Sequence, residues 1–126
     1  MEKEMIPYTC VGTNDLDRAT AFYSEIFAIL GARIFFRVDR AVFWGVSPDK
    51  PMFSLMKPFD EKPATVGNGS MVALSAADPD QVRAVHAKAL ELGAPCEGEP
   101  GERGGYGFYA YFRDLDGNKI AVRYHA

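Results

Sequence analysis

Residues 105–125 read GYGFYAYFRDLDGNKIAVRYH, and this stretch decides the fold. On both sides of the turn at 114–118, strand-forming residues fall into two sets that alternate along the chain, as expected when successive side chains point to opposite faces. Period-two alternation around an Asp-Gly-Asn turn predicts an antiparallel hairpin. Gly117 would supply a positive φ angle, and the side chain of Asp114 would close the turn.

The segment before this hairpin predicts a strand followed by a helix. Residues 71–76 (MVALSA) favour the strand, Asp78 is a good N-cap for the helix, and Gly93 would end it. His86 is expected on the polar flank of this helix, and a weak strand is predicted near 94–97.

The same order of elements is predicted in the first half of the chain. Residues 5–12 favour a strand, and a helix follows with Asn14 as its N-cap and Gly31 at its end. Three short strands are predicted next, at residues 32–38, 41–47 and 51–57.

A sequence repeat relates the two halves. Asp78 follows Asp15 by 63 residues, and Gly93 follows Gly31 by 62. Two helix ends could match by chance, but neither half could bury its sheet alone. We therefore expect one α+β domain in which two paired βαβββ modules form a curved eight-stranded mixed sheet around a cleft. The expected bounds are about 5–58 for the first module, 59–69 for a linker and 70–126 for the second module.

Composition excludes several classes of function. The formal net charge is −3 with both signs interspersed, which argues against a nucleic-acid-binding face. No apolar run approaches the ~20 residues of a membrane span, and the charged start MEKE is not typical of a signal peptide. Cys10 and Cys96 lack the close spacing of a metal site, which favours free thiols. We therefore expect a cytoplasmic protein that binds neither nucleic acid nor membrane.

Three segments carry a family resemblance: VGTNDLDRATAFYSEIF at 11–27, NGSMVAL at 68–74 and YFRDLDGNKIAV at 111–122. In this order they resemble the glyoxalase/bleomycin-resistance/dioxygenase superfamily, also called vicinal oxygen chelate. The resemblance implies paired βαβββ modules, a cupped site between them and, in most enzymatic members, a divalent metal. Reactions of such enzymes include isomerisation, thiol transfer to epoxides, epimerisation and ring cleavage by dioxygen, whereas other members only sequester drugs.

The residues at the family's metal positions are not metal ligands of the usual kind. The resemblance implies histidines at the positions of Tyr8 and Met71 and a glutamate at Ala121, with a further equivalent position near Ser54. Hard and borderline cations prefer carboxylate oxygen or imidazole nitrogen, and a catalytic zinc needs about three such ligands. We therefore expect no family metal and no other cofactor.

Strand alternation assigns the side chains that would face the cleft. The expected ligand-binding residues are Tyr8, Cys10, Ser54, Met56, Met71, Tyr109, Tyr111, Ala121 and Arg123. This aromatic lining with one fixed cation suits a flat or branched organic molecule that carries an anionic or carbonyl oxygen. The alternatives are core packing of the tyrosines, an inert thiol at Cys10 and a structural ion pair of Arg123.

These residues leave three functions open. The first is a metal-free protein that binds a small apolar or aromatic, or anionic, molecule, for example a drug-sequestering resistance protein. The second is a lyase, isomerase or dioxygenase-like enzyme with Tyr8 as acid/base and Arg123 as oxyanion stabiliser. The third is a structural or regulatory dimer with an empty cleft. The resemblance implies a homodimer, and the sequence leaves open whether the modules pair within a chain or across the dimer.

Overall fold

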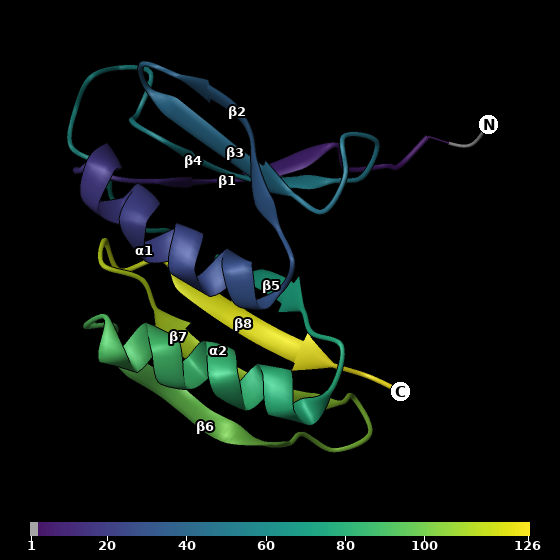
Figure 1. The fold of residues 1–126 in the computed structure, drawn as a ribbon. Coiled ribbons are helices and arrows are strands. Elements are labelled where there is room, and N and C mark those ends of the chain that lie inside the picture. Colours follow the sequence, from purple (N-terminus) through teal and green to yellow (C-terminus); the bar gives the residue numbers. More distant parts are fainter. Residues whose placement is uncertain (1–2) are drawn as a thin grey trace. The chain divides into compact units, whose positions relative to one another are not determined.

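The computed structural model describes residues 3–126. The chain forms two compact units that divide between Thr65 and Val66, and we call these units the first and the second module (Figure 1). The division falls inside the predicted linker, and residues 57–71 contain neither helix nor strand. A single domain built from both modules remains a prediction.

The first module contains one helix and four strands. They are β1 (Tyr8–Gly12), α1 (Leu16–Ile29), β2 (Arg33–Val38), β3 (Ala41–Gly45) and β4 (Met52–Met56). The strand order is β1-β4-β3-β2, with β1 parallel to β4 and the other neighbours antiparallel. The three predicted strands after α1 are thus present, each slightly shorter than predicted.

The second module repeats this order of elements (Figure 1). They are β5 (Val72–Ser75), α2 (Pro79–Glu91), β6 (Cys96–Glu102), β7 (Phe108–Arg113) and β8 (Lys119–Tyr124). The strand order is β5-β8-β7-β6, with β5 parallel to β8 and the other neighbours antiparallel. The α+β class and the two βαβββ modules are therefore confirmed, with the eight strands in two four-stranded mixed sheets. Neither helix of residues 3–126 has the length and apolar character that crossing a membrane requires.

Both helices begin at an aspartate. The Asp15 carboxylate accepts the Arg18 N–H at 3.1 Å, and the prediction of Asn14 as the cap was one residue early. The Asn14 side chain is engaged elsewhere, because its oxygen accepts the Ala64 N–H at 2.7 Å. In α2 the cap is Asp78, as predicted.

The core of the first module is aromatic. Tyr23 and Phe27 of α1 stack with their ring centroids 5.5 Å apart. Both rings lie against Trp44 of β3 and Phe53 of β4, at centroid distances from 4.8 to 6.0 Å. Burial of these four side chains fixes α1 on one face of its sheet.

The core of the second module is mainly aliphatic, with one buried phenylalanine, Phe112, and a buried histidine from its helix. Val82, Val85 and Ala89 of α2 are fully buried, as are Ile120 and Val122 of β8. His86 lies on the same side of the helix and is only 4% exposed. The prediction that His86 covers the polar flank of the helix was therefore wrong, because positions 82, 85, 86 and 89 share one helical face.

The hairpin between β7 and β8 is closed as predicted. Asp114 is buried, and its carboxylate accepts the N–H groups of Asp116 at 2.9 Å and Asn118 at 2.8 Å. It also accepts the Asn118 side-chain amide at 2.9 Å, and Gly117 has a φ angle of 92°. One carboxylate thus satisfies three donors and fixes the register of the two strands.

Strand β6 is longer than predicted. The sequence predicted a weak strand near 94–97, whereas β6 runs from Cys96 to Glu102. Its sequence, CEGEPGE, is poor in strand-forming residues, so pairing with β7 places it in the sheet. The pairing register shifts twice, between Cys96 and Gly98 and between Gly98 and Gly101.

Candidate functional site

The first module leaves one face of its sheet uncovered by its helix. Phe53 and Leu55 of β4 are buried, and Phe53 contacts α1, so their neighbours along the strand point to the opposite face. The pairing of Tyr8 with Met52 and of Cys10 with Ser54 places these residues on that opposite face. Of the expected ligand-binding residues, the face carries Tyr8, Cys10, Ser54 and Met56.

An aromatic pocket of about 690 Å³ opens at one end of this face. Tyr8 is 49% exposed and packs edge-on against Phe43 with centroids 5.1 Å apart. Phe36 is 54% exposed and meets the other side of Phe43 at 5.6 Å. The remaining lining residues are Lys3, Glu4, Pro7, Pro48, Asp49, Lys50, Pro51 and Met52.

Sequence reasoning missed the two phenylalanines of this pocket. It assigned no faces to residues 32–47, and a register shift between Ile34 and Phe36 breaks the simple alternation of β2. Pairing of the two predicted strands that became β3 and β4 could have assigned the face of Phe43, because Phe43 lies opposite Ser54 and shares its face.

Two expected lining residues of the first module differ in accessibility. Ser54 is fully buried, and its hydroxyl donates to the Thr9 carbonyl at 2.7 Å. This hydroxyl is therefore used in holding β1 to β4. Cys10 is exposed as a free thiol and can reach a ligand.

The second module also presents a face opposite its helix. Pairing places Tyr111 opposite Ala121 and Tyr109 opposite Arg123, with Ala73 of β5 beside Ala121. The rings of Tyr109 and Tyr111 stack nearly parallel, with centroids 5.7 Å apart and 13° between the planes. The alternation in the sequence therefore placed these four predicted site residues on one face.

Three cations lie over the tyrosine rings of this face, whereas the sequence predicted one cation in the site. The Arg123 guanidinium lies 5.8 Å from the Tyr109 ring. Arg103 and Lys119 lie 5.7 and 5.4 Å from the Tyr111 ring. Lys119 pairs with Arg113 across the hairpin, so alternation along the strand was sufficient to assign its face from the sequence. Arg103 follows the irregular strand β6, so alternation could not assign its face.

Arg123 is positioned by the loop between β6 and β7. Its Nε and Nη2 atoms donate to the Tyr106 carbonyl at 3.3 and 3.2 Å. Gly107 in this loop has a φ of 130°, and a Cβ there would lie 2.6 Å from the Tyr124 carbonyl. The loop thus runs close to β8, and Arg123 is held over the Tyr109 ring by a fixed backbone acceptor.

The residues at the family's metal positions do not fit a divalent metal. Tyr8 offers a phenol oxygen, which is neither a carboxylate nor an imidazole. Met71 is 47% exposed and offers a soft thioether, and Ala121 is a fully buried methyl group. The three side chains therefore lack the carboxylate and imidazole groups that divalent metals prefer.

Comparison with known proteins agrees with the fold and the sequence motifs. The model of the Glyoxalase/Bleomycin resistance protein/Dioxygenase superfamily matches residues 5–122. A glyoxalase/bleomycin resistance protein from Albidiferax ferrireducens is 35% identical, with a TM-score of 0.86 over 98% of this chain and 100% of that chain. No curated protein matches the sequence.

Two more distant solved structures share the fold. A lactoylglutathione lyase from Agrobacterium tumefaciens is 23% identical, with a TM-score of 0.71 over 98% of this chain and 96% of that chain. An antibiotic-binding protein from a Streptomyces species is 22% identical, with a TM-score of 0.70 over 100% of this chain and 99% of that chain. On the family model and the 35% identical structure, the chain belongs to the Glyoxalase/Bleomycin resistance protein/Dioxygenase superfamily.

Proposed function

We propose that this chain binds a small aromatic or amphipathic organic molecule, and that it does so without a metal at Tyr8, Met71 and Ala121. The observation that carries the proposal is the aromatic pocket of the first module, where Tyr8, Phe36 and Phe43 meet. Its volume of about 690 Å³ falls in the range of roughly 300–1,000 Å³ typical of small-molecule sites.

The exposure of the pocket's rings supports a binding role. Phe36 and Tyr8 are each about half exposed on the first module, although large apolar side chains are usually buried. Burial of apolar surface contributes roughly 25 cal/mol per Å², so a flat ligand that covers both rings gains several kcal/mol of gross binding energy. Two lysines and two carboxylates at the pocket rim, Lys3, Lys50, Glu4 and Asp49, leave it without a strong net charge.

The face of the second module supports a preference for ligands with an anionic or carbonyl oxygen. Arg123, Arg103 and Lys119 lie on the rings of Tyr109 and Tyr111, which offer apolar surface beside fixed positive charge. Guanidinium groups bind carboxylates with two parallel hydrogen bonds. An antibiotic-binding protein shares this fold, which is in keeping with a small-molecule ligand.

A panel of flat aromatic carboxylates and their neutral carboxamides tests the proposal by calorimetry. Phe36→Ala should weaken binding by about 1–2 kcal/mol, because it removes an exposed ring from the pocket. Phe59→Ala is the matched control, since Phe59 is an 86% exposed phenylalanine of the same module that does not line this pocket. Equal losses in both variants, or no binding by any probe, would contradict the proposal.

The same panel separates binding from catalysis. Recovery of each probe unchanged after incubation supports a binding protein. Conversion of a probe, abolished by Tyr8→Phe, would instead support a lyase or isomerase in which the Tyr8 hydroxyl transfers a proton.

We also propose that the chain is a homodimer. The support is the family resemblance together with large apolar side chains outside the pocket that are exposed on the single chain, among them Ile34, Val38 and Met71. Light scattering at tens of micromolar chain should give the mass of two chains, and a strictly monomeric mass would contradict the proposal.

A further inference from the structure

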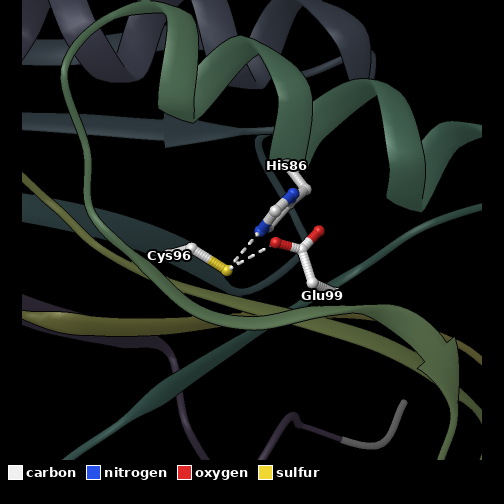
Figure 2. A group of neighbouring side chains, drawn as sticks. All are labelled: His86, Cys96 and Glu99. Carbon is white, nitrogen blue, oxygen red and sulfur yellow. Dashed lines mark hydrogen bonds between the residues drawn. The ribbon is translucent and has the colours of Figure 1, made fainter.

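A cluster of three side chains with metal-binding atoms lies on the helix side of the second module. It consists of His86 from α2 and Cys96 and Glu99 from β6 (Figure 2). The Cys96 sulfur lies 3.3 Å from His86 Nε2 and 3.3 Å from a Glu99 carboxylate oxygen. All three ligand atoms lie within 4.8 Å of one another.

The irregular course of β6 brings Cys96 and Glu99 together. In a regular strand, residues three apart point to opposite faces. The register shifts on either side of Gly98 change this alternation, so the Cys96 sulfur contacts both the His86 imidazole and the Glu99 carboxylate. At Gly98 a Cβ would lie 2.8 Å from the Tyr111 ring, so a larger residue would push β6 away from β7.

We propose that His86 Nε2, Cys96 Sγ and a Glu99 carboxylate oxygen bind a zinc ion, with a fourth position open to water or another ligand. Zinc bonds of ~2.0–2.3 Å in a tetrahedron place neighbouring ligand atoms roughly 3.3–3.6 Å apart. The two distances from the Cys96 sulfur are close to that spacing. The Glu99 side chain is exposed and can change rotamer to complete the third contact.

The chemistry of the three ligands selects the metal. A mixed set of nitrogen, sulfur and carboxylate oxygen suits zinc and is a poor match for Mg²⁺ or Ca²⁺, which take oxygen ligands. Binding would replace the S–H proton by the metal, and this proton passes to the buffer. This site is independent of the positions of Tyr8, Met71 and Ala121, and it does not depend on the proposed ligand.

The surroundings of Cys96 do not favour a redox-sensing thiol. Desolvation, with a smaller contribution from the Glu99 carboxylate, raises the pKa of the Cys96 thiol. Because oxidants attack the thiolate, a raised pKa disfavours a redox-sensing role for Cys96.

Titration of the EDTA-treated, reduced full chain with Zn²⁺ and Co²⁺ tests the proposal. We expect one metal per chain and, with Co²⁺, a thiolate-to-metal charge-transfer band. Cys96→Ser should abolish the band, and Glu99→Gln should weaken Zn²⁺ binding at least tenfold. Since Zn²⁺ would bind only the folded state, excess metal should also raise the unfolding temperature.

Matched controls separate this site from general effects. Cys10→Ser removes the other free thiol and should leave the band unchanged. Glu97→Gln changes a carboxylate two residues from Glu99 that pairs with Arg113 at 2.9 Å, and it should leave Zn²⁺ affinity unchanged. Absence of stoichiometric binding by the folded wild type, or a band that survives Cys96→Ser, would overturn the proposal.

Discussion

The two modules of this chain share a backbone plan and differ in their side chains. In both modules a helix connects the first strand to three antiparallel strands, and the last of these pairs in parallel with the first strand, so the strand orders are equivalent. Both helices have an aspartate cap and stop at a glycine with positive φ. The helix–sheet core is rich in aromatic residues in the first module and mainly aliphatic, with Phe112 and a buried histidine, in the second.

The sheet faces that the helices leave uncovered also differ in their side chains. The first module exposes an aromatic pocket around Phe43, whereas the second presents stacked tyrosines under three cations. The comparison teaches that caps, stops and strand order are sufficient to specify the repeated scaffold. Side chains on the faces are then free to differ, and they carry the proposed chemistry.

The largest expected effect comes from the aromatic core of the first module. Phe27→Ala should lower the free energy of unfolding by about 3–5 kcal/mol, because it leaves a cavity among Tyr23, Trp44 and Phe53. Val85→Ala, at a fully buried site of the second module, should cost about 2 kcal/mol. Urea denaturation measures the free energy of unfolding of both variants. Equal losses would contradict the expectation that the aromatic core contributes more to stability at this position than the aliphatic core does.

The next effect concerns the turns of the two equivalent hairpins. Asp114→Ala should destabilise the chain by about 2–3 kcal/mol, because three donors lose a buried charged acceptor. The β3–β4 turn of the first module uses an exposed contact between Ser47 and Asp49 instead. Asp49→Ala should therefore leave the urea midpoint unchanged, and a loss as large as that of Asp114→Ala would contradict the distinction.

Local signals in the sequence were sufficient for most of the scaffold. The DLDGN turn, the Asp78 cap and the two helix stops depend on residues within a few positions of each other, and the structure has them where predicted. The cap of α1 was placed one residue early because Asn14 and Asp15 are both good caps. In the structure Asp15 caps the helix, and the Asn14 side chain contacts Ala64, 50 residues away, which local sequence does not show.

Features that depend on strand pairing were not predictable in the same way. The composition of β6 does not favour a strand, and its shifted pairing with β7 decides both its length and the neighbours of Cys96. The register shift in β2 likewise hid the face of Phe36. On regular strands, alternation correctly placed Tyr8 with Cys10 and Tyr111 with Ala121, but it did not show that the Ser54 hydroxyl is already bonded.

A smaller effect is expected on ligand charge preference. If an aromatic carboxylate binds, Arg123→Ala should weaken it by about 1.5–3 kcal/mol and leave its neutral carboxamide less affected. Arg83→Ala is the matched control, because Arg83 also lies over a ring of the second module, that of Phe108, but belongs to α2. Calorimetry measures the binding of the acid and of the amide to each of the two variants. Equal losses for the acid and the amide would limit Arg123 to packing on Tyr109 and holding the loop at Tyr106.

The smallest effect tests whether the two modules are equivalent where their backbones match. Gly31 and Gly93 end α1 and α2 with φ angles of 75° and 104°. A Cβ at Gly31 would contact nothing within 4 Å, and one at Gly93 would meet only a Leu115 methyl at an ordinary 3.7 Å. Alanine at either position should therefore cost about 1–2 kcal/mol from the left-handed backbone alone. Urea denaturation of Gly31→Ala and Gly93→Ala should give losses that agree within about 0.5 kcal/mol, and the double variant should be additive because the sites are independent. A much larger loss at one site would show that one helix end carries strain beyond its φ angle, and that the modules differ in their scaffold as well as in their side chains.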